Sequence, residues 1–199
     1  MKRLITVIAT VVALTLPAMA WAAVWDIDPV HSHVGFSVRH LMIANVKGLF
    51  EKFAGTVTID EKDITKSGVE VSIDIASINT NVQKRDEHLR SADFFDVAKY
   101  PTMTFVSKKV AKAGKNRFKV TGDLTLHGVT QQVVLDVRDV SKETKDPWGG
   151  IRRGATVSTK IRRSDFGMTW NEVLESGGIA VGDEVLITLE VELVKAQQK

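Results

Sequence analysis

The sequence predicts an all-β fold of about eight antiparallel strands, interrupted once by a short helix. Apolar and polar residues alternate with period two over most of the chain, as they do in strands that bury one face. Turn-forming residues separate these runs, for example at 66–68 and 146–150. The chain has no cysteine, which excludes disulfides, a thiol nucleophile and thiolate metal sites. Its stability must therefore come from an apolar core, which a single domain of this length can build.

The first 22 residues have the pattern of a secretory signal peptide. Basic Lys2 and Arg3 precede an apolar run over 4–16, and small residues before Ala22 suit a signal peptidase. The run is shorter than the ~20 residues that a transmembrane helix needs. We therefore expect an exported protein whose single domain comprises residues 23–199. Loss of Lys2 and Arg3 lowers the formal net charge from +3 to +1, and no long basic run remains, so no nucleic-acid partner is expected.

The strands are expected where the alternation is clearest. In chain order they cover residues 34–38, 53–60, 69–75, 102–106, 118–126, 129–137, 155–161 and 185–193. Gly167 is expected to allow a turn before the last strand. Eight strands suit an up-and-down barrel of the lipocalin type. Alternation alone is equally compatible with a sandwich, because both folds bury every second residue.

A charged segment between the third and fourth strands breaks the alternation. Its composition predicts a helix over about 83–92, with Asn81 as the N-cap. Leu89 and Ala92 lie three residues apart and can face inward together. Two phenylalanines follow directly. We expect this segment to be a helical lid on the barrel or sandwich.

Four motifs in this order resemble the YceI-like family of periplasmic isoprenoid-binding proteins. They are WDIDPVHSHVGF at 25–36, KRDEHLRSADFFD at 84–96, GDLTLHGVT at 122–130 and RSDFGM at 163–168. The resemblance extends from Val24 to about Val194. It implies a single lipocalin-like barrel in the bacterial periplasm that holds a long isoprenoid chain, such as a quinone tail, or a related amphiphile.

The predicted ligand-binding residues form an apolar lining and a polar contact at the barrel mouth. The lining comprises Phe36, Val38, Phe53, Val57, Ile73, Phe94, Phe95, Phe105, Phe118, Val120, Met168 and Trp170. From the residues alone, a packed core is the favoured interpretation of the aromatic and methionine members of this set, and the resemblance reverses that preference. Glycines at 35, 55 and 122 would either leave space inside or relieve bends in the sheet. Arg85 and His88 are the predicted contacts to a polar head group. Residues 83–95 and 142–154 are the candidate openings.

The predicted function is a carrier or store without catalytic residues, metal or cofactor. Its partner would be an isoprenoid, quinone-like or fatty amphiphile, with transient contact to a membrane surface, and a homodimer is left open. An alternative is a hydrolase or metal enzyme using His31 and His33 with a carboxylate, although His-Glu-x-x-His and Gly-x-Ser-x-Gly are missing. A filled barrel acting as a stress or interaction module is a third alternative. The basic pairs 152–153 and 162–163 are expected to balance surface acids rather than to bind lipid.

Overall fold

The computed structural model describes residues 22–175 and 177–196, so residues 1–21 of the predicted signal peptide lie outside the described residues. The strands are β1 (Ala23–Ile27), β2 (His33–His40), β3 (Ala44–Phe50), β4 (Phe53–Ile59), β5 (Gly68–Asp74), β6 (Ile78–Asn79), β7 (Thr102–Gly114), β8 (Arg117–Leu126), β9 (Val129–Arg138), β10 (Thr144–Lys145), β11 (Ile151–Arg162) and β12 (Val181–Lys195). The helices are α1 (Gln83–Arg90) and three 3-10 turns, η1 (Ile64–Lys66), η2 (Ile75–Ser77) and η3 (Arg163–Phe166). None of these helices is long and apolar enough to cross a membrane.

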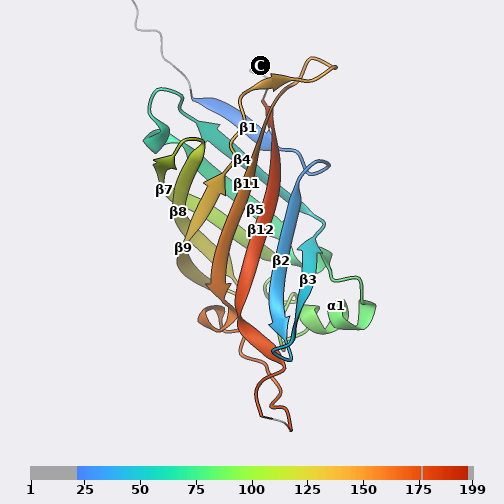
Figure 1. Cartoon of the computed structure of the whole chain (residues 1–199). Coiled ribbons are helices and arrows are strands. Elements are labelled where there is room, and N and C mark those ends of the chain that lie inside the picture. Colours follow the sequence, from blue (N-terminus) through green and yellow to red (C-terminus); the bar gives the residue numbers. More distant parts are fainter. Residues whose placement is uncertain (1–21, 176, 197–199) are drawn as a thin grey trace, which may run out of the picture.

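Eight of the strands close into an antiparallel barrel (Figure 1). The ring runs β1–β4–β5–β7–β8–β9–β11–β12, and it closes because β12 pairs with both β11 and β1. Closure pairs the edges that an open sheet would expose. The predicted all-β class and eight-stranded antiparallel barrel are confirmed.

The ring differs from the expected set of strands at one place. The run at 34–38 belongs to β2, which pairs with residues 181–190 of β12, whereas the ring member is β1, paired with 193–195. β1 and β2 therefore lie one after the other along the same side of β12. β3 pairs with β2, and β6 with β3. The sequence did not indicate β1 because Ala23, Val24 and Trp25 are three apolar residues in a row, so apolar and polar residues do not alternate there.

Helix α1 is confirmed, but its ends differ from the prediction. Val82, not Asn81, occupies the N-cap position, and its side chain makes no capping bond. Asn81 has a φ of 62°, and its backbone N–H donates to the side chain of Asn79. The buried carboxylate of Asp86 instead connects the helix to the segment before it, because it accepts hydrogen bonds from the backbone N–H and the hydroxyl of Thr80. The helix ends at Arg90, so the next turn does not form and residue 92 is exposed rather than packed inward.

The two ends of the barrel differ. We call the end where β1 begins and β10 lies the upper end, and the end near α1 and η3 the lower end (Figure 1). The fully buried side chain of Trp25 lies at the upper end. Phe166, Ile75 and Ile78, each at most 1% exposed, pack the lower end. The space between these two layers is the candidate site.

Candidate ligand-binding site

The barrel encloses an apolar cavity of about 260 Å³. Side chains from all eight ring strands or their connections line it, because alternate residues of each strand point inward. Among the described lining residues, only Ser32, Ser67, Thr159 and Arg153 carry polar side chains. The volume is close to the lower end of small-molecule pockets, roughly 300–1,000 Å³. The barrel is therefore hollow, unlike one that is filled by its own side chains.

A second apolar cavity of about 90 Å³ lies at the lower end, lined in part by Leu89 of α1 and by Phe95. Both cavities share the side chains of Phe36, Phe50, Met103 and Ile187 as lining. The rings of Phe36 and Phe50 lie 5.8 Å apart between centroids, and those of Phe50 and Phe95 lie 6.0 Å apart. These shared side chains form the wall between the two cavities.

Eleven of the twelve predicted lining residues face one of the cavities. The larger cavity has Phe36, Phe53, Val57, Ile73, Phe105, Phe118 and Val120 on its wall, and the smaller one has Val38, Phe94, Phe95 and Met168 as well as Phe36. Trp170 lines neither cavity; its ring packs against those of His88 and Phe94, with centroids 4.9 and 5.0 Å away. Trp170 follows the left-handed turn at Gly167, where strand alternation no longer predicts the direction of a side chain.

Arg85 and His88 do not lie at a cavity wall. Arg85 donates from Nε to the hydroxyl of Thr80 and from Nη2 to its carbonyl, both at 2.7 Å. The Nε2 atom of His88 is 2.9 Å from the carboxylate of Asp93. Both side chains thus connect α1 to the segments that precede and follow it at the lower end of the barrel. The predicted head-group contact has no support in these positions, because neither residue lines a cavity and the atoms Nε and Nη2 of Arg85 and Nε2 of His88 already have protein partners.

The inward glycines leave little free space. A Cβ atom at Gly122 would lie 2.5 Å from the ring of Phe105, and one at Gly55 would lie 2.5 Å from the carbonyl of Glu70. Of the three predicted positions, Gly35 alone lines the cavity, and a Cβ there would lie 2.8 Å from the ring of His33. At Gly55 and Gly122, therefore, the absent side chain makes room for neighbouring protein atoms rather than for a ligand.

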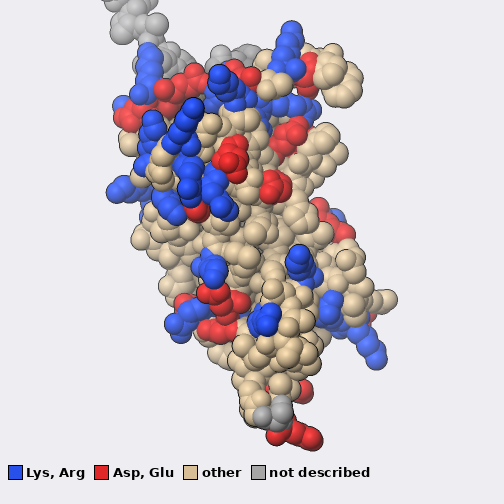
Figure 2. All heavy atoms as spheres, in the orientation of Figure 1, with Lys and Arg blue, Asp and Glu red and all other residues tan. Residues whose placement is uncertain are grey.

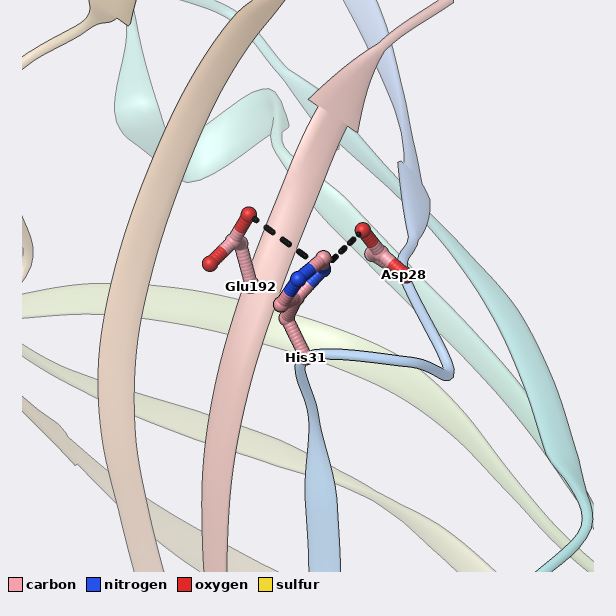
Figure 3. Close-up of side chains that lie close together, drawn as sticks. All are labelled: Asp28, His31 and Glu192. Carbon is pink, nitrogen blue, oxygen red and sulfur yellow. Dashed lines mark hydrogen bonds and ion pairs between the residues drawn. The ribbon is translucent and has the colours of Figure 1, made fainter. Parts of the chain in front are cut away.

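A polar cluster lies at the turn between β1 and β2, where Asp28, His31 and Glu192 approach one another (Figure 3). His31 Nδ1 is 2.8 Å from Asp28 Oδ2 and 4.0 Å from Glu192 Oε1. Arg152 Nη1 also donates to both carboxylates. The hydrogen bond with His31, and then that with Arg152, hold the pKa of Asp28 well below its usual value against the opposing effect of burial. His33 is not part of the cluster, because His31 lies in a turn and the strand begins only at His33.

This cluster is poorly suited to a metal ion or to hydrolysis. The guanidinium of Arg152 already occupies the position of a cation between Asp28 and Glu192. The neighbouring hydroxyl of Ser32 donates to the carbonyl of Glu192 at 3.3 Å and accepts from its backbone N–H at 2.9 Å. The ion pairs of Arg152 with Asp28 and Glu192, together with the hydroxyl of Ser32, thus join the turn to β12. The arrangement is that of a structural clamp whose charged side chains lie outside the barrel, while Ser32 also lines the cavity.

Arg152 and Arg153 lie on opposite faces of β11, so the prediction that both balance acids on the surface is wrong for Arg153. Arg152 joins the outer clamp, whereas Arg153 has the same alternation phase as Ala155 and Val157 and lines the larger cavity. This alternation phase in the sequence could have indicated that Arg153 points into the barrel. It was missed because the predicted strand began at residue 155.

Comparison with known proteins shows the family and the fold to which this chain is similar. A family model described as the YceI-like domain matches residues 25–193. A UPF0312 protein of Vibrio parahaemolyticus is 40% identical over 168 residues, which cover 83% of this chain and 88% of that protein. The crystal structure of Burkholderia cenocepacia BcnA is similar with a TM-score of 0.73 at 27% identity, covering 83% of this chain and 98% of that one. A structure described as a polyisoprenoid-binding domain from Saccharophagus degradans shares the fold, with a TM-score of 0.63 at 17% identity over 86% of this chain and 98% of that one.

Proposed function

The chain belongs to the YceI-like family, and from this premise we propose that it binds the apolar tail of a polyisoprenoid, or of another long-chain amphiphile, inside its barrel. The observation that carries the proposal is the enclosed cavity of about 260 Å³, whose wall is apolar except at four side chains. The description of a structural neighbour as polyisoprenoid-binding supports the choice of ligand class.

The energetics favour a carrier or store. Each CH₂ group that leaves water gains roughly 0.8 kcal/mol, so a long tail has a large driving force into the cavity. A bilayer offers the tail nearly the same gain. Exchange between protein and membrane is then close to balanced, and loading requires an opening rather than a chemical reaction. No catalytic role is proposed, because the outer cluster around Asp28 and His31 is held by Arg152.

Export to the periplasm is part of the proposal. It rests on the pattern of residues 1–22, of which 1–21 lie outside the described residues. The mass of the protein purified from its native host tests this: a mature chain that begins near Ala23 is expected, and a full-length chain in the cytoplasmic fraction would contradict export.

Contact with a membrane is proposed at the upper end. Trp148, in the loop between β10 and β11, is 87% exposed there. An exposed tryptophan is suited to the membrane–water interface, because its ring is apolar and its N–H is polar. We expect Trp148→Ser to reduce cosedimentation with lipid vesicles, while Lys145→Ser, at the end of β10 just before this loop, serves as the control. Equal sedimentation of wild type and the Trp148 variant would argue against this contact.

Mass spectrometry of gently purified protein tests the function itself. The native complex should carry one apolar species at about one copy per chain, and solvent extraction should release a single family of masses. A protein that is empty and also fails to take up an added isoprenoid quinone or a fatty-acid analogue would overturn the proposal.

A further inference from the structure

A charged side chain, Arg153, lies at the upper end of the cavity wall. Among the described residues that line the larger cavity, Arg153 alone is charged, and its side chain is 18% exposed. The guanidinium carbon lies 5.1 Å from the ring centroid of Trp25, which is fully buried. Trp25 has the same alternation phase on β1 as Ile27, which lines the cavity. Arg153 and Trp25 thus meet where the apolar wall ends.

Each of these two side chains has a buried hydrogen-bond donor without a partner. Within the described structure, neither Nε1 of Trp25 nor Nε of Arg153 has an acceptor. Buried donors are normally paired, because removing them from water without a new bond is costly. Arg153 lines the cavity and its guanidinium lies against the ring of Trp25, so two donors without acceptors lie near the upper end of the cavity wall. This is the property expected of a site whose acceptor belongs to a ligand.

The charges around Arg153 are already balanced. Its Nη2 atom lies 2.9 Å from Glu61 Oε1 and 3.4 Å from Glu143 Oε1, and Lys195 Nζ lies 3.0 Å from Glu143 Oε1. The neighbourhood therefore contains two cations and two carboxylates. Figure 2 shows basic and acidic side chains mixed over the upper end of the molecule. Because Glu61 and Glu143 already neutralise Arg153 and Lys195, no net positive charge remains to stabilise a phosphate or a carboxylate, whereas a neutral acceptor needs only the free donors.

We propose that Trp25 and Arg153 bind the polar head of the ligand, and that this head is neutral and bears a carbonyl oxygen as acceptor. The inference rests on the proposed binding of an apolar tail. It fixes the direction of the ligand: the head lies at the upper end beneath β10, and the tail points down the barrel toward Phe36 and Phe50. Arg85 and His88, at the lower end, take no part in head-group binding.

Calorimetric titration with three probes that share one ten-carbon alkyl tail tests the proposal. The probes are an alkyl benzoquinone, the alkyl phosphate and the alkylbenzene, which lacks acceptor oxygens. We expect the quinone to bind wild type most tightly. Arg153→Met keeps an unbranched apolar stem but removes the donors, and Trp25→Phe keeps an aromatic ring but removes the N–H. Each should weaken quinone binding about tenfold and leave alkylbenzene binding unchanged.

Arg162→Met is the matched control, since Arg162 ends the same strand but is 68% exposed and bonds to Asp183 outside the cavity. It should bind all three probes as wild type does. Unchanged quinone affinity in a folded Arg153→Met variant would overturn the head-group site. Tighter binding of the alkyl phosphate than of the quinone would overturn the neutral head. Failure of wild type to bind even the alkylbenzene would instead count against the proposed tail binding.

Discussion

Arg152 on β11 donates from Nη1 to the Oδ2 atom of Asp28 at 2.7 Å, and so connects positions 124 residues apart in the chain. The same guanidinium donates from Nε to Asp146 at 2.7 Å and from Nη1 to Glu192. One side chain thus joins the turn after β1, the loop before β11 and the strand β12. The segment at 142–154 is a predicted opening, but the hydrogen bond from Arg152 to Asp146 connects it to this cluster.

The clamp predicts a dependence of stability on pH. The hydrogen bond from His31, and then the one from Arg152, hold the pKa of Asp28 below its usual value. A hydrogen bond from Arg152 likewise lowers the pKa of Asp146. A carboxyl whose pKa is lower in the folded state stabilises the fold at neutral pH, and this contribution is lost as the pH falls below the unfolded value of about 3.9. We expect the melting temperature, followed by circular dichroism, to drop steeply between pH 5 and pH 2.

Arg152→Met should lower the melting temperature at pH 7 and make its fall toward pH 2 shallower. The exposed Arg162→Met, which leaves the clamp intact, serves as the control. A variant at Arg152 with the same acid dependence as wild type would show that the clamp does not control acid stability.

Adjacent valines on β9 test whether the ligand occupies the larger cavity. Val133 lines that cavity, whereas Val134 faces outward and is 48% exposed. Val133→Phe should fill part of the cavity and reduce the amount of bound ligand several-fold, at a cost in stability of about 1–3 kcal/mol from overpacking. Val134→Phe adds the same atoms outside and should bind as wild type. Equal ligand content in both variants, measured by native mass spectrometry, would place the ligand elsewhere.

The wall between the two cavities should limit the length of the bound tail. Phe36 faces both cavities, so Phe36→Leu should widen the connection between them and improve binding of long tails relative to short ones. Phe118→Leu also enlarges the larger cavity but lies away from this wall, which makes it the matched control. The measurement is a series of quinones that differ by one isoprene unit. An identical length preference in wild type and both variants would contradict a role of Phe36 in selecting tail length.

Gly167 has a left-handed backbone, with a φ of 78°, at the end of η3. Its N–H donates to the carbonyl of Ser164. An L side chain in this conformation costs about 1–2 kcal/mol, so Gly167→Ala should lower the unfolding free energy by that amount. Gly68→Ala, where the nearest neighbour atom is 3.7 Å away and φ is ordinary, should change it little. Urea unfolding of both variants provides the comparison, and equal midpoints would refute the expected strain.

The local pattern of the sequence determined seven of the eight ring strands and their inward faces. The alternation in 118–126 and 129–137 placed Phe118 and Val120 on the cavity wall, because side-chain direction in a strand depends on position alone. The four ordered motifs indicated the family that the comparisons then showed. Where the backbone leaves the extended conformation, as before Trp170 and at Asn81, the same reasoning failed.

Only the tertiary structure decided how the barrel closes and what lies at its two ends. Closure depends on β12 pairing with β11, β1 and β2, and such pairings between distant segments leave no periodic signal. The different roles of Arg152 and Arg153 follow from closure, since it makes one face of β11 the inside. The approach of Arg153 to Trp25, on strands far apart in the chain, exists for the same reason. Alternation is a property of neighbouring residues, whereas a binding site requires residues from all around the ring.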